Sequence, residues 1–145
     1  MAGHFYVDPL EIAQNEGIRV IPSNGLDVDG KIYKDKSGNV CIEYDSSVHP
    51  NRQRFTIAHE LGHYFKGHLA DKTLFRDSLQ NFNLDNYDIY EVEANNFAAD
   101  ILMPKDKIDF LLYKEGITSI EEMAHLLRVS QTAMMYRLKN LGYIS

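Results

Sequence analysis

The sequence predicts an α+β domain in which a small antiparallel sheet of about three strands packs on a core of helices. Between residues 18 and 45, apolar and polar residues alternate in short runs bounded by glycines, a pattern typical of strands. After residue 50, apolar residues recur every three or four positions, which is typical of amphipathic helices. The 145 residues are 44% hydrophobic and 25% charged, which suits one globular domain and excludes a disordered or fibrous chain.

A short helix and the strands of the sheet come first. Asp8 is a suitable N-cap, and Pro9 a suitable first residue, for a helix that ends near residue 16. The strands expected next are IRVI (18–21), KIYK (31–34) and NVCIEYD (39–45). The last two are expected to pair as a hairpin. The segment VCIEY either offers an edge to an extended substrate or is an ordinary, partly buried strand.

The helices of the core follow the strands. They are expected over residues 51–69, 89–103 and 105–114. The polar segment 71–88 has no clear period, so we expect a long loop there, and loops of that length are often functional. Three aromatic residues in and after this loop either line a substrate groove or belong to the core: Phe82, Tyr87 and Tyr90.

The C-terminal segment predicts two further helices. Ser119 and Glu122 have the spacing of a capping box, and Ser130 can cap the last helix. We therefore expect a single domain over the whole chain. Its core spans residues 1–116, and a C-terminal hairpin resembling a helix-turn-helix pair spans 117–145.

The stretch HELGH, at residues 59–63, carries the strongest chemical signal. In a helix, His59 and His63 project side by side, which suits two ligands of one metal ion. Glu60 is rotated by about 100° from His59, so it reaches a water on that ion more readily than the ion itself. The pattern H-E-x-x-H is the signature of zinc proteases, in which the glutamate is the general base.

A catalytic zinc ion usually needs a third protein ligand. The candidates downstream of the motif are Asp77, Asp85, Asp88, Glu91, Glu93 and Asp100. In the helix expected over residues 89–103, Glu91 shares a stripe with Asn95 and two small or apolar residues, whereas Glu93 lies on the opposite, solvated face. We therefore expect Glu91 to be the third ligand. Asn95, one turn later, either hydrogen-bonds a ligand or is an ordinary buried asparagine.

Two further side chains in the helix expected over residues 51–69 are candidates for stabilising the transition state. Tyr64 lies one turn after Glu60, and His68 one turn after Tyr64. Either residue could act as a second electrophile, and either could equally be a packing or capping residue.

Direct DNA binding by the C-terminal helices is not expected. The whole chain has a net charge of −6, whereas DNA-binding proteins normally present a basic surface. Residues 119–145 contain three basic and two acidic residues, a balance of +1: Arg128, Arg137, Lys139, Glu121 and Glu122. That excess is small for neutralising phosphates, so a scaffold or docking role is favoured.

The motifs together resemble a known family. The segments RQRFTIAHELGHYFKGH (52–68), EVEANNFAADILMP (91–104) and LLRVSQTAMMYRLKNLGYI (126–144) resemble the ImmA/IrrE family of zinc metallopeptidases. The resemblance covers most of the chain and implies a zincin-like core that holds one Zn²⁺. It also implies that His59, His63 and Glu91 are the metal ligands and that Glu60 is the catalytic residue.

The resemblance implies a substrate class as well. Members of this bacterial family cleave a helix-turn-helix repressor and so relieve repression of a mobile element, a prophage or a stress response. Two alternatives remain at this point. One is a non-catalytic zinc-containing module that sequesters a repressor or acts in a toxin–antitoxin pair, and the other is a DNA-binding regulator.

The expected location is the cytoplasm. Cys41 is the only cysteine, so the chain has no internal disulfide, which suits a reducing compartment. The first residues lack the basic and apolar regions of a signal peptide. No stretch approaches the roughly 18 apolar residues that span a bilayer, so no membrane association is expected.

Overall fold

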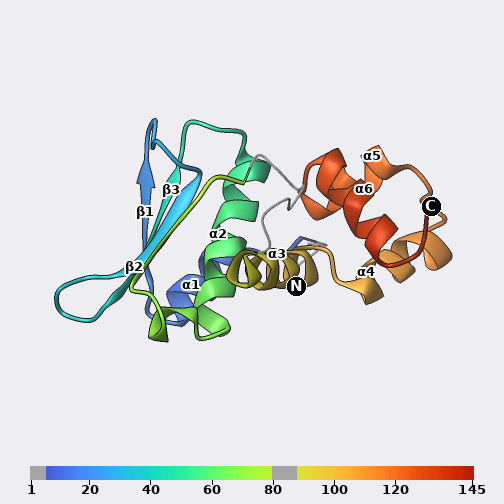
Figure 1. The fold of residues 1–145 in the computed structure, drawn as a ribbon. Helices are drawn as coiled ribbons and strands as arrows, with labels where there is room; N and C mark the ends of the chain where they lie inside the picture. The colour runs from blue at the N-terminus through green and yellow to red at the C-terminus, as the bar shows by residue number, and fades with distance from the viewer. Residues whose placement is uncertain (1–5, 80–87) are drawn as a thin grey trace. The chain divides into compact units, whose positions relative to one another are not determined.

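The computed structural model describes residues 6–79 and 88–145 and confirms the α+β class (Figure 1). The chain divides into two compact units, which are described separately. The first contains residues 8–98, and the second contains residues 99–145 with the described part of residues 1–7. The division of one domain into a core over 1–116 and a hairpin over 117–145 stays a prediction.

The first unit contains a four-stranded mixed sheet. Its strands are β1 (Arg19–Ser23), β2 (Gly30–Lys34), β3 (Val40–Asp45) and β4 (Leu74–Asp77). Their order is β1-β3-β2-β4, with β1 parallel to β3 and the other pairs antiparallel. The predicted small sheet is therefore confirmed, with four strands where about three were expected, but its wholly antiparallel pairing is wrong, because β1 runs parallel to β3. Alternating patterns locate strands but do not specify which strands pair. Here β2 follows β1 in the sequence, but β3 lies between them in the sheet.

Strand β3 has no free edge, because β1 and β2 pair with its two sides. The suggestion that VCIEY offers an edge to a substrate is therefore wrong, and an ordinary inner strand is the correct alternative. Strand β4 was instead predicted to be part of a loop. It has only four residues, two of them charged, and its antiparallel partner β2 lies about 40 residues earlier in the chain.

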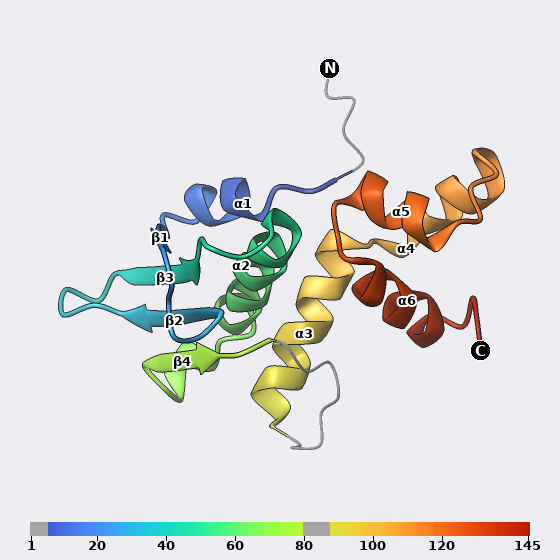
Figure 2. The same cartoon turned by 90° about the horizontal axis from the view of Figure 1, so that it is seen from above.

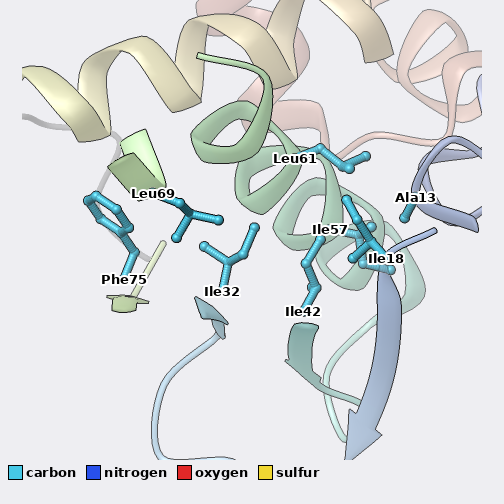
Figure 3. Close-up of a cluster of buried hydrophobic side chains, with 8 residues drawn as sticks. All are labelled: Ala13, Ile18, Ile32, Ile42, Ile57, Leu61, Leu69 and Phe75. Carbon is cyan, nitrogen blue, oxygen red and sulfur yellow. The ribbon is translucent and has the colours of Figure 1, made fainter. Parts of the chain in front are cut away.

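Helix α2 (Pro50–Phe65) packs against the sheet, with α1 (Pro9–Asn15) beside it (Figure 1 and Figure 2). The side chain of Asp8 caps α1 by accepting a hydrogen bond from the backbone N–H of Leu10, as expected. Figure 3 shows isoleucines of the sheet facing Ile57 and Leu61 of α2. The buried cluster consists of Ala13, Ile18, Ile32, Ile42, Ile57, Leu61, Leu69 and Phe75. This cluster packs the apolar side of α2 against the sheet.

Helix α3 (Ile89–Leu102) lies against α2 at a glycine. A Cβ atom at Gly62 would lie 2.8 Å from the Cα and 2.9 Å from the carbonyl oxygen of Ala94. Ala94 is fully buried, and so is Ala98 one turn later. Gly62 therefore permits a backbone-to-backbone approach of the two helices that no other residue allows.

We expect Gly62→Ala to lower the free energy of unfolding by at least about 1 kcal/mol, because the new methyl group forces α3 away from α2. Helix propensity alone would have the opposite effect, raising stability by up to about 1 kcal/mol. Urea denaturation of the metal-free protein measures the change. An increase in stability would contradict the close contact.

The second unit contains the C-terminal helical pair. Helix α4 (Lys105–Asp109) continues into a π-helical turn (Phe110–Lys114), and α5 (Ile120–Leu127) and α6 (Gln131–Asn140) follow. Both expected caps are present, since the hydroxyl of Ser119 accepts from the N–H of Glu122 and that of Ser130 accepts from the N–H of Ala133. Apolar side chains from both helices are buried: Met123, Leu127, Met134 and Leu138.

The arginines of this pair are engaged within the unit. Arg137 donates to the backbone oxygen of Met103 at 2.9 Å and to the carboxylate of Asp100 at 3.0 Å. The guanidinium of Arg128 lies 4.1 Å from the centre of the Tyr6 ring. No helix in the described ranges is both long enough and apolar enough to cross a membrane.

Candidate metal centre

Two helices and one strand bring four metal-ligand side chains together. Helix α2 supplies His59 and His63, α3 supplies Glu91, and Asp77 is the last residue of β4. Their donor atoms all lie within 4.8 Å of one another. The predicted trio is therefore brought together, and Asp77 joins it.

Carboxylate oxygens of Glu91 and Asp77 lie close to the Nε2 atoms of both histidines. Glu91 places one carboxylate oxygen 2.9 Å from Nε2 of His59 and the other 3.3 Å from Nε2 of His63. Oδ2 of Asp77 lies 3.2 Å and 3.0 Å from the same two nitrogens. Ligands at about 2.1 Å from a tetrahedral zinc ion are separated by roughly 3.4 Å. Two imidazoles and two carboxylates at this spacing fit Zn²⁺ or a similar divalent cation.

Glu60 is buried beside these donors. The side chain is fully buried, and among the described residues neither carboxylate oxygen has a hydrogen-bond partner. Gly30 makes room for it, since a Cβ atom there would lie 3.1 Å from Oε2 of Glu60. A buried carboxylate without partners is costly, so this position suits a group that contacts a water or substrate atom.

The second nitrogens of both imidazoles are also hydrogen-bonded. Nδ1 of His59 lies 2.8 Å from the side-chain oxygen of Asn95, so Asn95 has the ligand-orienting geometry suggested by its place on α3. Nδ1 of His63 lies 2.8 Å from Nδ1 of His68, in the short helix η1 (His68–Ala70). The hydroxyl of Tyr64 instead donates to Glu16, at the end of α1. That contact favours the packing role of Tyr64 over the electrophile role.

A cavity of about 260 Å³ adjoins the donors. Asp77, Glu91 and Asn95 line it together with Lys72 and Arg76. Ligand sites in proteins are usually concave and combine a few converging polar groups. The donor cluster is therefore next to a space that a ligand or a peptide side chain can enter.

Comparison with known proteins identifies the family. Residues 13–139 match the family model described as the IrrE N-terminal-like domain. The chain belongs to the ImmA/IrrE family of metallopeptidases. The family predicted from the motifs is thereby confirmed.

Three relatives illustrate the range of the ImmA/IrrE family. The radiation response metalloprotease IrrE of Deinococcus deserti is 38% identical over 100 residues, covering 67% of this chain and 35% of the relative. Its namesake in Deinococcus radiodurans is 35% identical over 107 residues, covering 72% and 32%. The uncharacterized immunity region protein 2 of Bacillus phage phi105 is 31% identical over 134 residues, covering 86% and 81%. The match thus spans about a third of each Deinococcus protein but most of the phage protein.

Asp77 is the residue of this ImmA/IrrE family member that sequence reasoning passed over. It was among the acidic candidates, but helical periodicity can rank only residues on a helix, and β4 was taken for a loop. The sequence Leu-Phe-Arg-Asp does not alternate in polarity and so gives no strand signal, although Phe75 and Asp77 are buried in the structure while Leu74 and Arg76 are exposed. Three other candidates lie outside the described residues: Asp85, Phe82 and Tyr87.

The carboxylates control the protonation of the two histidines in the metal-free protein. Burial alone would lower the pKa of His59, but Asp77 and Glu91 outweigh it and raise this pKa to about 9. The same two carboxylates raise the pKa of His63 against the effect of burial. Burial, together with Asp77 and Glu91, raises the pKa of Glu60 well above its usual value. Without a metal, the cluster therefore holds protons that a cation would displace.

We expect zinc binding at pH 7 to release at least about one proton per chain, because a ligating imidazole must be neutral and the pKa of His59 is about 9. The apparent zinc affinity should accordingly rise with pH and level off above pH 9. Calorimetry in buffers of different ionisation enthalpy measures the protons released. The exposed His125 provides a control, since His125→Ala should leave the proton count unchanged. A heat of binding that is identical in all buffers would contradict the expectation.

Proposed function

We propose that this chain is a zinc-dependent endopeptidase that cleaves a helix-turn-helix repressor in the cytoplasm. The observation that carries the proposal is the buried carboxylate of Glu60, which lies beside four converging metal donors and has no hydrogen-bond partner in the described part of the chain. Membership in a metallopeptidase family supports hydrolysis of a peptide bond. The word "immunity" in the name of the phage relative supports a repressor as the substrate.

The catalytic roles follow from the positions of the side chains. His59, His63 and Glu91 would hold the zinc ion, which activates water and polarises a substrate carbonyl when bound in such a site. The carboxylate of Glu60 takes a proton from the attacking water and delivers it to the nitrogen of the leaving amine. Burial, together with Asp77 and Glu91, raises the pKa of Glu60, and a raised pKa makes an ionised carboxylate a stronger base.

Asp77 must leave its place for this chemistry to occur. Catalytic zinc sites have three protein ligands and an open position, whereas sites with four protein ligands are usually structural. Asp77 would be a fourth donor to the ion, and it ends a short strand that pairs on one side only among the described strands. We propose that the arriving substrate displaces Asp77.

The edge of β4 offers a way to hold that substrate. β2 pairs with one side of β4, and no described strand pairs with the other side. An extended peptide can add to such an edge through backbone hydrogen bonds. This placement would bring the peptide past Asp77 and the cavity that adjoins the donors.

A cleavage assay tests the proposal directly. The zinc-loaded chain is incubated with helix-turn-helix repressors from its own genome, and mass spectrometry identifies the fragments. A single cut at a defined bond supports the proposal. An intact repressor that forms a stable complex with the chain would instead favour the non-catalytic module. The presence of Asp77 as a fourth donor supports that alternative, because zinc sites with four protein ligands are usually structural.

A further inference from the structure

We propose that His68 and Glu93 form a hydrogen-bond chain that positions His63 as a metal ligand and links it to the carboxylate of Glu93. The inference rests on the metal site of the proposed function but not on peptide hydrolysis. Nδ1 of His63 lies 2.8 Å from Nδ1 of His68, and Nε2 of His68 lies 2.7 Å from Oε1 of Glu93. The three side chains come from α2, η1 and α3, so the chain links separate elements.

The rings in this chain are held by their surroundings. His63 stacks on Phe75, with ring centres 4.1 Å apart and planes inclined by 17°. His68 is 3% exposed and meets Tyr90 edge to face, with ring centres 4.8 Å apart. Neither imidazole is therefore free to turn its hydrogen-bonding atoms elsewhere. Glu93 is half-exposed, so its carboxylate contacts solvent at the outer end of the chain.

Only one arrangement of protons is compatible with metal binding through His63. Nε2 of His63 faces Asp77 and Glu91, so this nitrogen must be free of a proton to bind the ion. The remaining proton of His63 is then on Nδ1 and is donated to Nδ1 of His68. That nitrogen must accept, which leaves the proton of His68 on Nε2, where it is donated to Glu93.

The two histidine ligands are consequently held in different ways. The partner of His59 is the neutral amide oxygen of Asn95, whereas the partner of His63 is an imidazole backed by a carboxylate. A hydrogen bond that ends on a charged group is roughly twice as strong as a neutral one. The chain therefore selects the tautomer of His63 that leaves Nε2 free for the metal.

Three variants test this inference. Glu93→Gln keeps a hydrogen-bond acceptor but removes the charge, and His68→Phe removes the acceptor for His63. Asp100→Asn is the matched control, because it makes the same carboxylate-to-amide change on α3 at a residue that contacts Arg137 instead. Zinc affinity is measured by competition with a chromophoric chelator, and ¹H–¹⁵N correlation spectra of histidine-labelled protein report which ring nitrogens carry protons.

We expect His68→Phe to weaken zinc binding by about 10–100-fold and Glu93→Gln by about 3–10-fold, with Asp100→Asn unchanged. In the zinc-loaded wild type, the spectra should place the proton of His63 on Nδ1 and that of His68 on Nε2. A packing role for His68 would not make zinc affinity depend on the charge of Glu93. If His68→Phe fails to fold, the zinc affinity of Glu93→Gln relative to that of Asp100→Asn tests the inference by itself.

Several results would overturn the inference: a proton on Nδ1 of His68, a zinc affinity of Glu93→Gln equal to that of Asp100→Asn, or no zinc binding by the wild type. A wild type that binds zinc with the expected tautomers but cleaves no repressor would overturn the proposed function alone. The two failures are thus distinguishable.

Discussion

Glu60→Gln is expected to slow repressor cleavage by about 10²–10⁴-fold, the usual contribution of a general base, without loss of bound zinc. The amide has the same shape as the carboxylate but cannot accept the proton of the attacking water. Glu60 has no described hydrogen-bond partner to lose, so the fold should be retained. Cleavage is followed by gel electrophoresis, and zinc content by atomic absorption.

His59→Ala is the companion variant to Glu60→Gln. It removes a donor atom, so both zinc and activity should be lost. If Glu60→Gln still inactivates the repressor while His59→Ala does not, inactivation requires the metal site but not the base. The non-catalytic module would then be the correct function.

Asp77→Ala is expected to change zinc binding and cleavage in opposite directions. Loss of a fourth donor should weaken zinc binding by at least about tenfold. Cleavage at saturating zinc should become faster, by up to about tenfold if the closed arrangement holds roughly 90% of the wild-type molecules. Asp27→Ala is a suitable control, because Asp27 is an exposed carboxylate that pairs with Arg76 of β4 and is not a donor.

Cobalt substitution adds a measurement that does not depend on turnover. The visible spectrum of Co²⁺ responds to its coordination, so wild type and Asp77→Ala should differ, whereas wild type and Asp27→Ala should not. If Asp77→Ala loses zinc and gains no activity, Asp77 is a permanent ligand. The site would then be a closed structural centre.

The parts of this site that could be predicted from the sequence are those that local helical geometry determines. The grouping of His59 with His63 follows from their spacing within one helix, and the inward direction of Glu91 follows from the stripe that it shares with Asn95. In the structure, His59, His63 and Glu91 converge, and Asn95 contacts His59, as that helical geometry requires. The helix caps at Ser119 and Ser130 are local in the same sense.

The parts that could not be predicted depend on contacts between distant segments. β4 forms because β2 offers it an edge, and four residues of mixed polarity carry too weak a pattern to reveal that pairing. Asp77 was missed for this reason. Glu93 was expected on a solvated face, and its carboxylate is half-exposed, but its contact with His68 depends on where η1 turns after α2. The parallel pairing of β1 with β3 is non-local as well.

The contact between Gly62 and Ala94 bears on how the site responds to cations. Gly62 is inside the HELGH segment, so the same few residues supply the imidazoles and the point where the neighbouring backbone rests against them. Since a Cβ atom at position 62 would clash with the backbone of Ala94, the spacing of the helices that carry His59, His63 and Glu91 depends on this glycine, and so does the separation of the donors that a cation would meet.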